Sequence, residues 1–156
     1  MTDSSPLPPV KLRSLAFALL AKREYSAADL KEKLLAVGAD AAEVELLLEE
    51  LSHSHYQSDA RMAGMLVRQN MRKGRGMARI QQDLKKHQID PELAEHELQD
   101  INWLQQAIAL RIKKFGRDLP GDPKEKNRQL RFLQYRGFDL DICFKALSTP
   151  AEDEDS

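Results

Sequence analysis

The stretch LKKHQIDPELAEHELQDI (residues 84–101) has two counterparts in the same chain, LLAVGADAAEVELLLEEL (residues 34–51) and LQYRGFDLDICFKAL (residues 133–147). Each copy contains a leucine, an aspartate six residues later, and apolar residues four and eight positions after that aspartate. The first leucines of the copies are 50 and then 49 residues apart. Repetition at this period indicates units that stack on their neighbours. The sequence therefore predicts an all-α fold of three tandem three-helix, helix-turn-helix-like repeats in an elongated array. Such an array favours a binding platform over an enzyme.

The aspartate of each copy stands where a helix must begin, because its side-chain oxygens can accept hydrogen bonds from the unpaired amides of the first turn. These residues are Asp40, Asp90 and Asp139. Pro91 follows the second of them, and proline is favoured at the first helical position. Gly38 and Gly137 stand where a left-handed residue ends the preceding helix, and Gln88 replaces glycine in copy two.

Hydrophobic spacing divides the chain into five segments. Residues 1–9 are polar and proline-rich and are expected to form a disordered arm, whereas residues 149–156 form an acidic tail. The three repeats are predicted at residues 10–58, 59–101 and 102–148.

Helical spacing also predicts individual helices. The first is expected from about Lys11 to Lys22, and the first helix of repeat two from Arg61 to Lys73. Ser26, Asp59 and Asp122 are predicted to cap helices. Strand patterns do not occur in the sequence.

The composition is that of a soluble helical protein, with 42% hydrophobic and 31% charged residues and a net charge of -1. A single cysteine rules out an intramolecular disulfide framework. The sequence contains neither a membrane-spanning apolar run nor a signal-peptide pattern. A cytoplasmic protein is the resulting expectation.

Positive charge is concentrated in the second and third repeats, where two glycines in RKGRG (residues 72–76) permit a close approach of backbone to a partner. The helix start that follows offers free N–H groups suited to phosphate. If the basic side chains share a face, that face can follow a phosphate backbone. The simpler alternative is that they only solvate amphipathic helices. The candidate binding residues are Arg68, Arg72, Lys73, Arg75, Arg79, Lys85, Lys86, Lys113, Lys114, Arg117, Arg128, Arg131 and Arg136. Arg61 and Arg111 carry further positive charge in the same repeats.

Signals for catalysis and cofactors are weak. The four histidines lack the spacing of a metal site, so neither a metal nor a cofactor is expected. Cys143 occupies the repeat position of Val44 and Ala94, which favours a buried apolar thiol over a nucleophile. No GxxxxGK[ST] loop occurs, so nucleotide hydrolysis is not expected. The chain is therefore expected not to be an enzyme.

Four stretches within residues 12–147 resemble the RecX family, the bacterial regulatory proteins that bind and modulate the RecA recombinase. They are SAADLKEKLLAVG (26–38), YQSDARMA (56–63), RKGRGMARIQQDL (72–84) and LRFLQYRGF (130–138). The resemblance implies three tandem three-helix units and binding along the RecA–DNA filament. It also implies inhibition of RecA ATPase, recombinase and co-protease activities in DNA repair and the SOS response. A monomer that contacts the DNA backbone without sequence specificity, and no membrane, is the corresponding expectation.

The sequence departs from the family pattern at YQSD (residues 56–59), at Met62 and at Gln88, which concern packing and turns more than the basic surface. Two other functions remain open from the residues themselves. A helix-turn-helix transcription regulator would prefer particular duplex sequences, although few side chains here suit base readout and Tyr135 beside Arg136 is the one suggestive pair. A general helical adaptor would bind neither DNA nor RecA.

Overall fold

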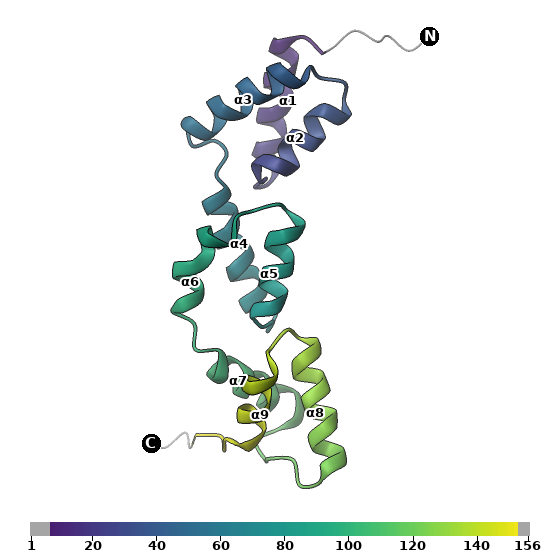
Figure 1. Cartoon of the computed structure of the whole chain (residues 1–156), viewed down its shortest axis with the longest axis vertical. Coiled ribbons are helices and arrows are strands. Elements are labelled where there is room, and N and C mark those ends of the chain that lie inside the picture. The colour runs from purple at the N-terminus through teal and green to yellow at the C-terminus, as the bar shows by residue number, and fades with distance from the viewer. Residues whose placement is uncertain (1–6, 153–156) are drawn as a thin grey trace, which may run out of the picture. The chain divides into compact units, whose positions relative to one another are not determined.

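A computed structural model describes residues 7–152, and all of their regular secondary structure is helical (Figure 1). No helix within this range is long and apolar enough to cross a membrane. The predicted all-α fold is confirmed. The elements are α1 (Pro9–Lys22), α2 (Ala27–Ala36), α3 (Ala41–His53), α4 (Asp59–Arg72), α5 (Met77–Lys86), a 3-10 turn η1 (Pro91–Ala94), α6 (Glu95–Gln99), α7 (Trp103–Phe115), α8 (Pro123–Tyr135) and α9 (Leu140–Ser148).

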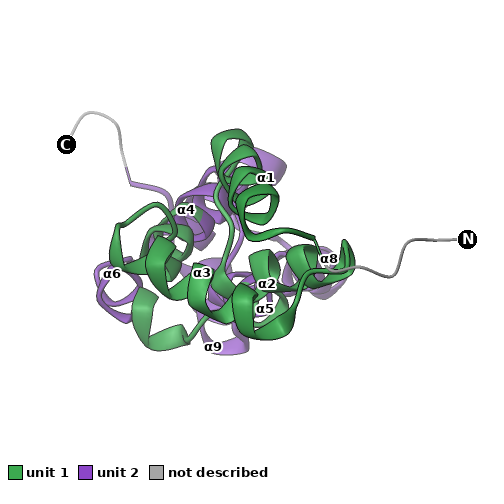
Figure 2. Cartoon of the chain, turned by 90° about the horizontal axis from the view of Figure 1, so that it is seen from above, with its two compact units in different colours: residues 1–65, 84–94 green, residues 66–83, 95–156 purple. Residues whose placement is uncertain are grey.

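The chain divides into two compact units (Figure 2). The first unit comprises residues 1–65 and 84–94, and the second comprises residues 66–83 and 95–156. Both α4 and α5 contribute residues to each unit. The repeat boundaries predicted from the sequence therefore stay predictions. Most of the predicted arm and half of the predicted tail, residues 1–6 and 153–156, lie outside the described range.

The repeated phrase folds locally as its sequence predicts. The leucine that opens each copy, at 34, 84 and 133, is fully buried, and so are Val44, Ala94 and Cys143. Each aspartate accepts a first-turn amide: Asp40 from Glu43 N (3.2 Å), Asp90 from Glu92 N (3.0 Å) and Asp139 from Ile142 N (3.0 Å). The residue two positions before each aspartate has a positive φ, at Gly38 (86°), Gln88 (54°) and Gly137 (102°). The turn geometry is thus kept in copy two even without glycine.

The predicted cap at Asp59 is wrong by one residue. Helix α4 begins at Asp59, and the hydroxyl of Ser58 accepts the amide of Arg61 (3.1 Å). The Asp59 carboxylate instead accepts Ala27 N (2.8 Å) and Gln57 Nε2 (2.8 Å). The aspartate therefore holds the start of α2 against the start of α4.

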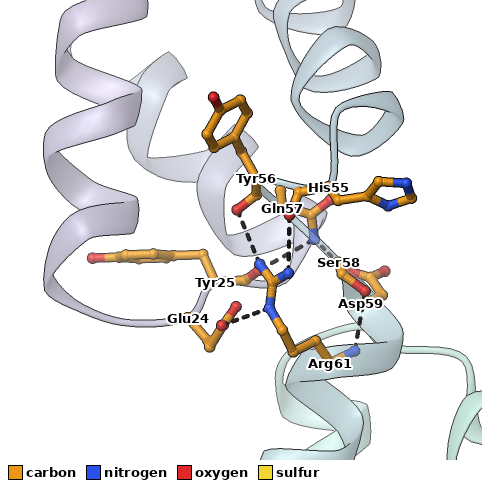
Figure 3. Close-up of polar contacts among 8 residues, drawn as sticks. All are labelled: Glu24, Tyr25, His55, Tyr56, Gln57, Ser58, Asp59 and Arg61. Carbon is orange, nitrogen blue, oxygen red and sulfur yellow. Dashed lines mark hydrogen bonds and ion pairs between the residues drawn. The ribbon is translucent and has the colours of Figure 1, made fainter.

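Arg61 is committed to the same junction, shown in Figure 3, and does not belong to a free basic surface. Its Nε donates to Glu24 Oε1 (2.6 Å), while Nη1 and Nη2 donate to the carbonyls of His55 (2.9 Å) and Tyr56 (3.1 Å). Gln57 is 2% exposed and donates to the carbonyl of Tyr25 (3.2 Å). The sequence around Arg61 does not reveal these contacts, because one partner, Glu24, lies 37 residues earlier in the chain.

Apolar cores lie within the first three and the last three helices of the described residues. Helices α1 to α3 enclose a core that contains Leu12, Leu30 and Leu34. Helices α7 to α9 enclose a second core, in which the rings of Trp103 and Phe138 meet edge to face at 6.4 Å. Burial raises the pKa of the Cys143 thiol in this core to about 11, and the nearby Asp139 carboxylate acts in the same direction. The predicted buried thiol is confirmed.

Candidate functional site

Two turns of the second unit dock directly on each other. The turn between α4 and α5 ends at Gly76, whose N–H donates to the carbonyl of Arg136 (2.8 Å) in the turn between α8 and α9. Ala78 N donates to the carbonyl of Gly137 (3.1 Å). A Cβ at Gly76 would lie 2.4 Å from Gly137 O, and one at Gly137 would lie 2.4 Å from Arg79 Cγ. Only glycine therefore fits on either side of this contact.

This docking corrects the interpretation of the RKGRG glycines as an approach surface for a partner. The close approach at Gly76 is made by the chain's own Gly137, sixty-one residues later. The amides of Gly76 and Ala78, expected to be available for phosphate, donate within the chain instead. Sequence proximity alone gave no signal of a partner so distant along the chain.

Arg136 strengthens the docked turns. Its Nη2 donates to the carbonyl of Lys73, and its Nε donates to the carbonyl of Gly74 (3.4 Å). Both acceptors lie just beyond the C-terminal end of α4, where unpaired carbonyls and the helix dipole favour a cation. Arg136 thus has a structural role as well as a position at the site described next.

A groove of about 510 Å³ lies beside the docked turns, between the end of α4 and helices α7 and α8. Its size is within the usual range of ligand sites, about 300–1,000 Å³. We call it the cationic groove, and its lining contains five basic residues and no carboxylate. The basic residues are Arg72, Lys73, Lys113, Lys114 and Arg136.

The uncharged lining of the groove completes a surface suited to a chain of phosphates. Leu110 and Phe132 form part of its wall, and Gln106 contributes an amide. The Lys114 ammonium lies 5.7 Å from the centre of the Phe132 ring, a cation–π distance. Because no carboxylate lines the groove, its positive charges are available to an anionic ligand.

The cationic groove brings together five of the thirteen predicted binding residues. Arg68 and Arg131 are exposed outside its lining, and Arg75 is half-buried. Arg79 lies over the Tyr135 ring at 5.5 Å. Arg128 lies over Phe115 at 5.2 Å and pairs with Glu125 (3.3 Å), while Arg117 contacts the carbonyl of Glu152. Lys85 and Lys86 are exposed and belong to the first unit.

Arg111 does not share a surface face with the other basic residues of the third repeat. It is 0% exposed, and its guanidinium nitrogens have no hydrogen-bond partner in the described part of the chain. Burial lowers the pKa of this guanidinium. The signal available in the sequence is its spacing, since Arg111 falls four residues after the buried Ala107 on the inner stripe of α7.

No cluster of three or more potential metal-binding side chains occurs among residues 7–152.

The sequence did not indicate Gln106, Leu110 and Phe132 as groove residues. Phe132 carries a usable signal, because it lies four residues before Arg136 and therefore on the same side of α8.

Comparison with known proteins identifies the family. The model described as "RecX, third three-helix domain" matches residues 100–147, and the one described as "RecX, second three-helix domain" matches residues 58–98. The Regulatory protein RecX of Acinetobacter baylyi is 51% identical over 146 residues, covering 94% of this chain and 92% of the relative. The protein of the same name from Halorhodospira halophila is 35% identical, covering 92% and 91%.

A solved structure shares the fold. The structure described as "Crystal structure of RecX from Lactobacillus salivarius" matches with a TM-score of 0.77 at 19% identity, covering 89% of this chain and 94% of that one. The sequence matches extend over both compact units and include all five basic residues of the cationic groove within the two family-model ranges. The chain therefore belongs to the RecX family of regulatory proteins.

Proposed function

We propose that this chain is a non-enzymatic regulator that binds the RecA recombinase on DNA and inhibits its ATPase, recombinase and co-protease activities. The cationic groove carries this proposal, because its five basic residues and carboxylate-free lining suit a phosphate backbone. RecA as the protein partner follows from membership of the RecX family. The cytoplasm, where DNA repair and the SOS response take place, is the corresponding location.

The groove supports contact with the DNA backbone more than readout of base sequence. Its basic side chains come from three places in the chain, namely residues 72–73, residues 113–114 and Arg136. Lysines act as flexible point charges that match phosphate positions without a fixed geometry. Gln106 is the one side-chain amide in the lining, and Arg136 is occupied by the carbonyls of Lys73 and Gly74, so few lining side chains suit bidentate base readout. Binding without sequence preference is the expected behaviour.

Inhibition would follow from contact with both components of the filament. A protein held on the DNA backbone by the groove would place its other surfaces against RecA subunits. It would thereby favour one arrangement of neighbouring subunits, which is how a ligand with different affinities for two states shifts their balance. Subunit movement linked to ATP hydrolysis would slow.

A charge-neutralising variant tests the role of the groove. Lys73→Gln, Lys113→Gln and Lys114→Gln together remove three exposed charges from the lining. If each contacts a phosphate, the slope of log K against log salt for single-stranded DNA falls by roughly 2, at about 0.7 per contact. The matched control replaces three exposed lysines of the first unit, Lys11, Lys22 and Lys33, by glutamine.

The decisive measurement is RecA ATPase on single-stranded DNA, titrated with wild type, groove variant and control. The wild type and control should slow hydrolysis, and the groove variant should require a higher concentration. A wild-type chain that leaves the rate unchanged over a wide titration would refute RecA regulation. Full inhibition by a folded groove variant would remove the groove from the mechanism. Enrichment of particular duplexes in a random-sequence binding screen would favour a transcription regulator instead.

A further inference from the structure

Tyr135 presents an aromatic ring to solvent at the end of α8. Its side chain is 74% exposed, more than that of any other aromatic residue in the described range. A single exposed apolar side chain is common on protein surfaces and does not define a site. Tyr135 differs from a single exposed side chain of that kind because the guanidinium of Arg79 lies over its ring.

Arg79 supports one face of the ring. Its guanidinium carbon lies 5.5 Å from the ring centre, within the range of a cation–π contact. Arg79 is itself held in place, because its Cγ and backbone pack against Gly137 in the docked turns. With Arg79 on one face and 74% of the side chain exposed, the tyrosine ring is positioned while most of its surface stays accessible.

Tyr135 does not itself line the cationic groove, but it lies in sequence between two residues that do. Phe132 and Arg136 line the groove, and Tyr135 lies three residues after the first and one before the second. Residues three and four apart lie on one side of a helix. Arg131 lies four residues before Tyr135, so it adds an exposed cation on the same side of α8, whereas Arg128 is engaged with Glu125 and Phe115.

We propose that Tyr135, supported by Arg79, stacks an unpaired nucleobase, so that the site selects single-stranded over duplex nucleic acid. This inference rests on the proposed function of the groove. A basic groove that follows the backbone, combined with an aromatic ring on which bases stack, is the arrangement that binds single strands. In a duplex the base faces are already stacked on their neighbours, so the ring gains nothing there. The groove alone would bind both forms through their phosphates.

The test compares two labelled oligonucleotides of equal length and charge by fluorescence anisotropy with the full chain. One contains thymidines throughout, and the other is abasic at every internal position. One stacked base is worth roughly a fivefold to more than hundredfold difference in affinity. The wild type is therefore expected to bind the thymidine strand at least fivefold more tightly.

Single substitutions show which aromatic ring causes the difference in affinity between the thymidine and abasic strands. Tyr135→Ala should remove the difference between the strands while leaving affinity for the abasic strand unchanged, and Tyr135→Phe should retain it. Tyr56→Ala is the matched control, because Tyr56 is also an exposed aromatic, at 55%, but belongs to the first unit. It should bind both strands as the wild type does.

The outcomes separate the two proposals. Equal wild-type affinity for both strands would overturn the stacking inference and leave backbone binding by the groove intact. Failure of the wild type to bind either strand would overturn both. A Tyr135→Ala variant that binds DNA normally but no longer slows RecA ATPase would also overturn stacking, and would indicate instead that the ring contacts protein.

Discussion

Replacement of Gly76 by alanine should separate the two docked turns. The new Cβ would lie 2.4 Å from Gly137 O, 2.5 Å from Gly137 C and 2.6 Å from Phe138 N. All three are backbone atoms, so no side-chain rotation can relieve the overlap. An ordinary contact at this position needs about 1 Å more, and a shift of that size breaks the hydrogen bonds from Gly76 N and Ala78 N.

The expected loss of stability can be worked from these contacts. Two hydrogen bonds contribute about 2 kcal/mol, and overpacking adds roughly 1–3 kcal/mol. Gly76→Ala should therefore lower the free energy of unfolding by about 3–5 kcal/mol. For a chain of this length, that corresponds to a fall in Tm of roughly 6–20 °C.

Trp103 provides a local assay. It is the single tryptophan, it belongs to the second unit, and it packs against Phe138 beside the docked turns. Thermal and urea unfolding followed by its fluorescence therefore report on the affected unit. Gly121→Ala is the control, since a Cβ there meets nothing within 4 Å. Salt-dependent DNA affinity should fall with Gly76→Ala, because the two sides of the cationic groove lose their fixed spacing. Equal Tm values for the two alanine variants would refute the docking of the turns.

Three further predictions concern individual side chains. Arg111→Met replaces an unpartnered buried cation by an apolar side chain, so it should raise the free energy of unfolding by about 1–4 kcal/mol in urea titrations. The control, Arg131→Met, changes an exposed residue and should leave the free energy of unfolding nearly unchanged. Destabilisation by Arg111→Met would contradict the absence of a partner. The Cys143 thiol has a pKa of about 11 in the folded chain, against 9.0 in the unfolded chain. The protonated thiol therefore contributes fully to the free energy of unfolding below pH 9, and this contribution is lost as the pH rises from 9 through 11. The stability difference between wild type and Cys143→Ala should therefore change by roughly 2 kcal/mol between pH 8 and pH 11, and a constant difference would exclude this linkage. Asp59 accepts two hydrogen bonds, so Asp59→Ala should destabilise the chain by about 2–4 kcal/mol in circular dichroism melts. Ser58 caps one helix, so Ser58→Ala should cost about 1 kcal/mol. The opposite order would return the capping role to Asp59.

The parts of the fold that sequence predicts well are those determined by neighbouring residues. Asp40, Asp90 and Asp139 cap helices because the amides they accept lie two or three residues away. The same local rule placed the cap at Asp59 rather than Ser58. Both residue types accept hydrogen bonds, and the pattern does not distinguish adjacent positions.

The candidate site depends on contacts that local patterns do not contain. A run of basic residues predicts positive charge, but helical rotation directs only some of them into the cationic groove. Arg61 and Arg111 both belong to basic stretches of the sequence. Arg61 nevertheless pairs with Glu24, and Arg111 faces inward on α7. The contact between Gly76 and Gly137 joins distant positions, so neither glycine reveals its partner to an inspection of either turn alone.

The docked turns make the repeats non-interchangeable. Gly137 of the third copy is in contact with Arg79 of the second predicted repeat, whereas Gly38 of the first copy has nothing within 4 Å of its Cβ position. A chimera that exchanges the first and third copies would place an unmatched turn opposite Gly76 and would lose the guanidinium contacts of Arg136. The position of the third copy is thus specified by steric complementarity between two glycine turns. Insertions and shuffling of whole repeats should be tolerated far less than the similarity of their helix-capping phrases implies.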